Sequence, residues 1–155
     1  MWTFARALSG EGLETVSRVI ATEGPGRQRQ RLRRTIAEAL RCLVQKPALD
    51  GEARDLAASI VFCLQDIGDT VEQVTEAWEH RNYYIRADQF RLEWAWTGQI
   101  AEILRSALVE KRWDELPLIL ARLLPHFADI RVIRMTRNPS DWEGAYARLC
   151  GEEQT

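Results

Sequence analysis

Two long series of apolar residues, each with alternating steps of four and three, constrain this sequence more than any other feature. The first series runs from Ala53 to Trp78 and the second from Tyr83 to Leu108. An average spacing of 3.5 residues places every member on one side of an α-helix, as in helices that pack in bundles. Each series therefore predicts a helix of about 26 residues, roughly 39 Å long at 1.5 Å per residue.

The step between the two series, from Trp78 to Tyr83, breaks this pattern. A step of five would rotate the apolar side away from its partner if one helix continued. Asn82 can adopt the left-handed conformation that ends a helix, or cap the start of the next one. The sequence therefore predicts an all-α helical bundle built on a long antiparallel hairpin, with helices over about 52–80 and 82–111. One continuous helix with a stutter is the alternative.

Shorter helices are expected before the hairpin. Leu13, Val16 and Ile20 indicate a first helix, which the Gly-Pro-Gly turn at 24–26 ends. Apolar residues between 32 and 43 indicate a second, which stops before Pro47. A chain of 155 residues, 46% of them hydrophobic, can bury one sizeable core. We therefore predict a single all-helical domain over 1–155.

Two further helices are expected after the hairpin. Asp114 is placed to cap the first, and Pro125 should kink or break it. A capping box from Ser140 to Glu143 should start the last helix. The stretch 130–135 is the one segment with some strand character, but a lone strand would have no partner.

Composition limits the setting in which the protein works. The longest apolar run, 56–64, is too short to cross a bilayer, and the first residues lack the pattern of a secretory signal. The cysteines are three in number, without paired spacing, which is typical of a reducing compartment. We expect a cytoplasmic protein without membrane contact. No nucleotide-binding or zinc-protease motif is present, and no cofactor is predicted.

The leading functional hypothesis is a non-enzymatic protein-interaction or scaffold module. The segment 74–96 holds three of the six tryptophans and two adjacent tyrosines, at the expected turn of the hairpin. From Trp96 onward, a second apolar strip widens the fourth helix, and such width indicates burial on two sides. Interfaces favour Trp, Tyr and Arg anchors. The predicted contacts with a partner protein, or with a second copy, are Arg81, Tyr83, Tyr84, Arg86, Trp96, Ile100 and Ile103.

A nucleic-acid-binding protein is the first alternative. Arginine side chains pair well with phosphate, and the second helix carries several of them on one face: Arg27, Arg31, Arg34 and Arg41. Aromatic residues do not interleave with them, so the stacking expected for single strands is missing. A net charge of −2 gives no global attraction to nucleic acid. Surface ion pairing is the simpler interpretation of this stripe.

A metal-dependent hydrolase is the second alternative. Asp66, Asp69, Glu76 and His80 follow one face of the third helix, opposite its apolar side. Carboxylate oxygens on a rigid element suit hard divalent cations. The pattern is incomplete, because the Glu-x-x-His pair of ferritin-like di-iron proteins would need glutamate where Ala77 stands. A solvated polar face, as on any amphipathic surface helix, explains these residues more simply.

Overall fold

The computed structural model describes residues 23–154, and this range is helical and irregular, without a strand. The predicted all-α bundle is confirmed, while the helix expected around Leu13 to Ile20 lies outside the described residues. The α-helices are α2 (Pro25–Val44), α3 (Gly51–His80), α4 (Tyr84–Val109), α5 (Leu116–Leu123) and α6 (Ala145–Gln154). Short 3-10 turns are η2 (Trp113–Glu115), η3 (Leu124–Phe127) and η4 (Pro139–Asp141).

A three-residue turn joins α3 to α4, so the alternative of one continuous helix is wrong. The backbone N–H groups of Arg81 and Tyr83 both donate to the carbonyl of Trp78, at 3.0 and 2.9 Å. Between them, Asn82 has a φ of 65°, in the left-handed region that asparagine tolerates better than most residues. The chain reverses at this point, and α3 and α4 run antiparallel with extensive mutual contact.

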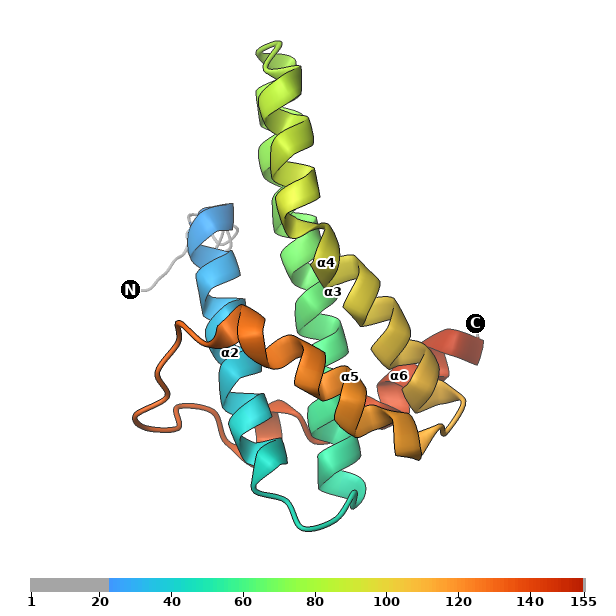
Figure 1. Cartoon of the computed structure of the whole chain (residues 1–155). Helices are drawn as coiled ribbons and strands as arrows, with labels where there is room; N and C mark the ends of the chain where they lie inside the picture. Colours follow the sequence, from blue (N-terminus) through green and yellow to red (C-terminus); the bar gives the residue numbers. More distant parts are fainter. Residues whose placement is uncertain (1–22, 155) are drawn as a thin grey trace, which may run out of the picture.

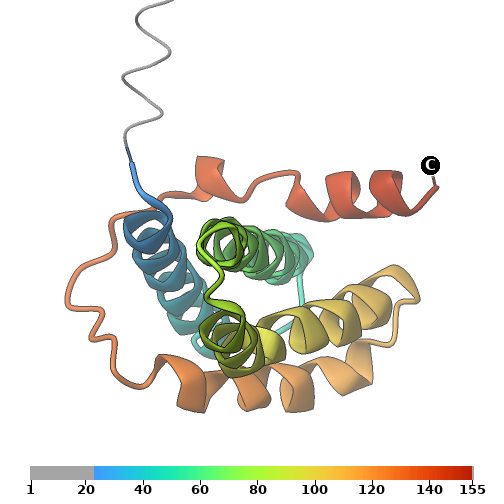
Figure 2. The ribbon, with the colours of Figure 1, turned by 90° about the horizontal axis from the view of Figure 1, so that it is seen from above.

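The hairpin has a half inside the bundle and a half that projects from it (Figure 1). In the lower half, α2, α5 and α6 surround α3 and α4, and side chains such as Leu56, Ile60, Leu64 and Leu104 are fully buried. Seen from above, the hairpin rises from the middle of these shorter elements (Figure 2). The core therefore fixes the lower half of the hairpin, and the upper half meets solvent on most sides.

The start of α5, the first α-helix after α4, differs from the sequence prediction. Asp114 lies inside η2 and does not cap α5, which begins at Leu116. The predicted interruption at Pro125 is confirmed, because the α-helix ends at Leu123 and the chain continues as the 3-10 turn η3.

The expected capping box from Ser140 to Glu143 is wrong. Asn138 and Asp141 form the reciprocal cap instead, around the short turn η4. The first turn of α6 is capped from another helix, since the carboxylate of Asp55 in α3 accepts the N–H of Tyr146 at 2.9 Å. The cap is therefore a long-range contact that local sequence does not reveal.

Among residues 23–154, no helix has both the length and the apolar character needed to cross a bilayer.

Candidate interaction surfaces

The aromatic residues of the projecting hairpin pack chiefly on one another. The rings of Trp78 and Phe90 meet edge to face with centroids 5.2 Å apart, and Phe90 lies 6.4 Å from Trp94. The guanidinium of Arg86 lies 4.4 Å above the ring of Trp78, and Arg29 of α2 covers both Phe90 and Trp94. Such pairs add to the stability that burial provides. Most of the tryptophan-rich segment therefore serves folding.

Ion pairs along the flank of the hairpin join its two helices. Arg91 of α4 donates to the carboxylates of Glu79 at 2.8 Å and Glu72 at 3.3 Å, both on α3. Hydrogen bonding to Arg91 lowers the pKa of Glu79. Because these groups meet solvent, which screens their attraction, the pairs contribute little to stability. The flank holds the antiparallel register and offers little free charge.

The end of the hairpin exposes a run of large side chains. Tyr83, Tyr84 and Ile85 follow one another at the start of α4 with 49%, 56% and 76% of their surface exposed. Leu92, two turns further along α4, is 77% exposed. We call this set, together with the exposed arginines at the turn, the tip surface: Arg81, Tyr83, Tyr84, Ile85, Arg86 and Leu92.

One line of residues on α4 divides into a covered and an uncovered part. Ile85, Leu92, Trp96 and Ile103 are seven, four and seven residues apart, which places them on one side of the helix. Trp96 stacks on His126 with centroids 3.7 Å apart and planes 8° apart, so η3 covers it. The upper two residues of the line have no such cover among the described elements.

The structure divides the predicted interaction residues into a covered group and an exposed group. Ile100 is 3% exposed, and Trp96 and Ile103 pack against the core of the same chain. The wide apolar face of α4 is largely covered from within the same chain, so Ile100 is buried and Trp96 and Ile103 are only partly exposed. Arg81, Tyr83, Tyr84 and Arg86 are all exposed at the tip, and Ile85 and Leu92 join them.

The arginines of α2 bind other parts of the same chain. Arg34 donates to the carbonyl of Arg134 at 3.2 Å, and Arg41 donates to that of Val132. Arg31 pairs with Glu23 at 3.0 Å, while Arg27 is exposed to solvent. The stretch of strand character at 130–135 is thus an irregular segment fastened to α2. Most of the arginine stripe therefore has an intramolecular role.

Glu38 is the centre of this attachment, and sequence reasoning missed it. Its side chain is fully buried and accepts hydrogen bonds from the N–H groups of Thr136 and Arg137, at 2.8 and 2.9 Å. Burial alone would raise the pKa of this carboxyl, but the bonds from Thr136, Arg137 and Arg34 outweigh it and lower the pKa to about 2. A glutamate among helical apolar residues is usually solvent-facing, so no local signal marked it.

The four candidate metal ligands do not converge. Asp66 and His80 are fourteen residues apart on one straight helix, or about 21 Å at 1.5 Å per residue. Within 23–154, no group of three or more histidine, cysteine or acidic side chains is arranged to hold an ion. Partial desolvation, with repulsion from Asp69 in addition, raises the pKa of Asp66. This face is an exposed acidic strip.

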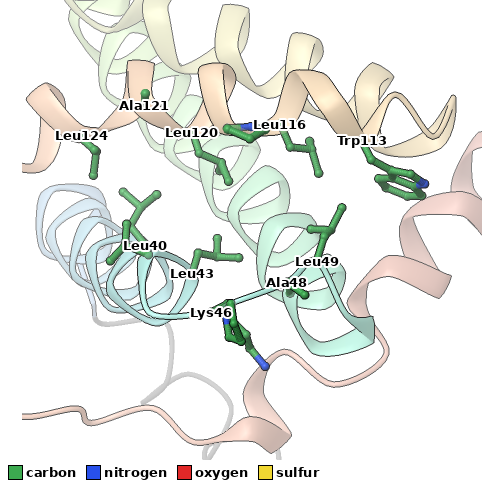
Figure 3. Close-up of a pocket in the computed structure, with 14 residues that line it drawn as sticks. Leu40, Leu43, Lys46, Ala48, Leu49, Trp113, Leu116, Leu120, Ala121 and Leu124 are labelled. Carbon is green, nitrogen blue, oxygen red and sulfur yellow. The ribbon is translucent and has the colours of Figure 1, made fainter.

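An apolar groove on the body of the bundle was also missed by sequence reasoning. It lies between the end of α2, the loop 45–50 and α5, and has a volume of about 380 Å³. Leu40 and Leu43 face Leu116 and Leu120 across it (Figure 3). Val44 and Leu124 at its edge are 67% and 46% exposed. The available signal was the sequence of α5, LPLILARL, in which only one residue is charged.

Comparison with known proteins does not assign the chain to a protein family. No protein family, curated protein or solved structure matches it. The fold and its surfaces define an all-helical protein with a projecting hairpin, and its function is inferred from those surfaces.

Proposed function

We propose that this protein is a non-enzymatic interaction or scaffold module that binds a partner protein through the tip surface. The observation that carries the proposal is the run Tyr83, Tyr84 and Ile85, exposed together at the end of a projection. Isolated exposed apolar residues are common on protein surfaces, but a contiguous set on a projecting element favours an interface.

The chemistry of the tip surface suits protein recognition. Tyrosine offers a large contact area and a hydroxyl, and it loses little conformational entropy when it becomes fixed. Arg81 and Arg86 flank the tyrosines and supply cationic groups of the kind found at the centres of interfaces. On α4, Ile85 and Leu92 continue the line that η3 covers lower down, and a partner would complete this cover. The tip surface therefore combines tyrosine and arginine side chains with apolar residues that no described element covers.

The two alternatives have weaker support. Nucleic-acid binding would use the stripe of α2, where Arg31, Arg34 and Arg41 already bind groups of this chain. Metal-dependent hydrolysis would need side chains that converge, and those of the acidic strip are spread along α3. The cytoplasm remains the proposed setting, and the thiol of Cys63, whose pKa burial raises to about 12, is consistent with an unreactive packing cysteine.

Site-specific photo-crosslinking in cells tests this proposal. A photoreactive phenylalanine replaces Ile85 in one sample and Ile133 in the control, because Ile133 is 83% exposed on the irregular segment away from the tip. The proposal predicts a discrete adduct with another protein from position 85 and little or none from position 133. Equal yields at the two positions, or no adduct at the tip, would count against it.

A further inference from the structure

The helix α5 carries apolar residues on its outer side as well as on the side that faces the core, and Arg122 is its one charged residue. Leu116, Ile119 and Leu123 face the core and are at most 5% exposed. On the outer side, Leu118 is 75% exposed and Pro117 and Ala121 are also exposed. Figure 2 shows α5 along one edge of the bundle, with no described segment outside it. Exposed apolar residues on the outer side of a surface helix favour a partner that covers them.

Two exposed charges of opposite sign frame Leu118 symmetrically. Asp114 lies four residues before it and Arg122 four residues after it, and both are exposed. Asp114 lies in the 3-10 turn η2 directly before α5, and Arg122 lies in the last turn of α5, so opposite charges stand at the two ends of this helix. If two copies of α5 meet antiparallel with Leu118 at the centre, each Asp114 comes opposite an Arg122. The same two-fold arrangement places Leu118 against its own copy.

We propose that a second copy of this chain covers α5, in a two-fold symmetric homodimer centred on Leu118. A two-fold interface uses one patch on both subunits, so the patch must complement itself. This patch does so in charge, through Asp114 and Arg122. This inference is independent of the proposed function, which concerns the tip surface.

The symmetry also sets how the two hairpins are directed. For antiparallel helices packed face to face, the two-fold axis lies in the interface and is perpendicular to α5. Figure 1 shows α5 running obliquely across the direction of the projecting hairpin, so this axis is inclined to the hairpin but leaves the bundle on the same side. Rotation about it turns the hairpin but leaves it projecting from that side. The dimer therefore presents two tip surfaces on the same side, which would strengthen binding to a partner with two sites.

Sedimentation equilibrium of the full chain, with charge-swap variants, tests the dimer. Asp114→Arg or Arg122→Asp alone turns both attractive pairs into repulsive ones and should weaken dimerisation about tenfold or more. The double variant D114R/R122D restores opposite charges across the axis and should return the dissociation constant to within about threefold of wild type. Leu118→Asp should abolish the dimer. Circular dichroism checks that each variant remains folded.

Two matched controls separate this interface from other causes. Ile133→Asp places the same charge on another exposed apolar residue and should leave dimerisation unchanged. Ile85→Asp alters the tip surface and should also leave it unchanged, so loss of partner binding and loss of the dimer are distinguishable. A strict monomer at high concentration, a dimer insensitive to Leu118→Asp, or single variants that the double variant does not rescue would each overturn the proposal.

Discussion

Glu38 and Thr136 lie 98 positions apart in the sequence, yet the carboxylate of Glu38 accepts both the backbone N–H of Thr136 at 2.8 Å and its hydroxyl at 2.6 Å. The N–H of Arg137 and the guanidinium of Arg34 complete the set, at 2.9 and 3.2 Å. A buried carboxylate with so many donors fastens the irregular segment to α2. Its ionisation is therefore linked to the stability of this part of the fold.

The stability of the protein should fall as the pH drops from about 5 to about 2. The pKa of Glu38 is about 2 in the folded state, against an ordinary value of 4.5. A carboxyl with a lowered pKa stabilises the fold above its unfolded pKa and loses this contribution as the pH approaches its folded pKa. For Glu38 the loss is about 3 kcal/mol. Urea unfolding at several pH values measures it.

Glu38→Gln should lower the free energy of unfolding at pH 7 by about 2–3 kcal/mol, because the amide brings donors to a site full of donors. Thr136→Val is the matched control and removes only the hydroxyl, so its cost should be nearer about 1 kcal/mol. The difference in the free energy of unfolding between wild type and Glu38→Gln should also decrease as the pH falls. Equal urea midpoints of unfolding for Glu38→Gln and wild type at pH 7 would contradict the role given to this carboxylate.

Lys111→Gly should raise the melting temperature. Lys111 follows the end of α4 with a φ of 60°, a conformation that costs a side-chain-bearing residue about 1 kcal/mol and costs glycine little. The gain should be about 1 kcal/mol, less the entropy that glycine adds to the unfolded chain. Lys111→Ala is the control, which keeps the Cβ and should give no gain. Differential scanning calorimetry compares the two, and a lower melting temperature for the glycine variant would refute the expectation.

Arg33→Gln should destabilise the protein, whereas Arg27→Gln should not. The guanidinium of Arg33 is mostly buried and donates to Asp129 at 2.7 Å and to the carbonyl of His126 at 2.8 Å. Its loss should cost about 1–3 kcal/mol, since charge-assisted bonds are involved. Arg27 is exposed, and its replacement should change stability by less than about 0.5 kcal/mol. Similar costs for the two variants would mean that the contacts of Arg33 with Asp129 and His126 do not stabilise the packing of η3 against α2.

The periodic parts of the fold could be predicted from the sequence, and the contacts between distant segments could not. Alternating steps of four and three require no knowledge of partners, and they marked α3 and α4. The cap of α6 by Asp55 and the attachment through Glu38 are polar contacts over about ninety residues or more, and no local pattern encodes them.

The same distinction holds for the candidate site. The sequence singled out Tyr83 and Tyr84 because they fall at the break between two periodic series, and both are exposed. It also singled out Trp96, because a wide apolar face on a helix shows that a second side is covered. The width of that face does not show which segment or partner covers it. His126, which stacks on Trp96, lies thirty residues further along the chain. Which apolar faces remain free depends on the path of the connecting segments.

The most direct test of the central claim is competition for the adduct formed by the photoreactive residue at position 85. Excess unlabelled wild-type protein is added to a cell extract, and in a parallel sample the same excess of a folded variant carrying Tyr84→Ser and Leu92→Ser. If the tip surface binds the partner, the wild-type protein suppresses the adduct and the variant does not. Equal suppression by both proteins would contradict the account, because binding would then lie outside the tip surface.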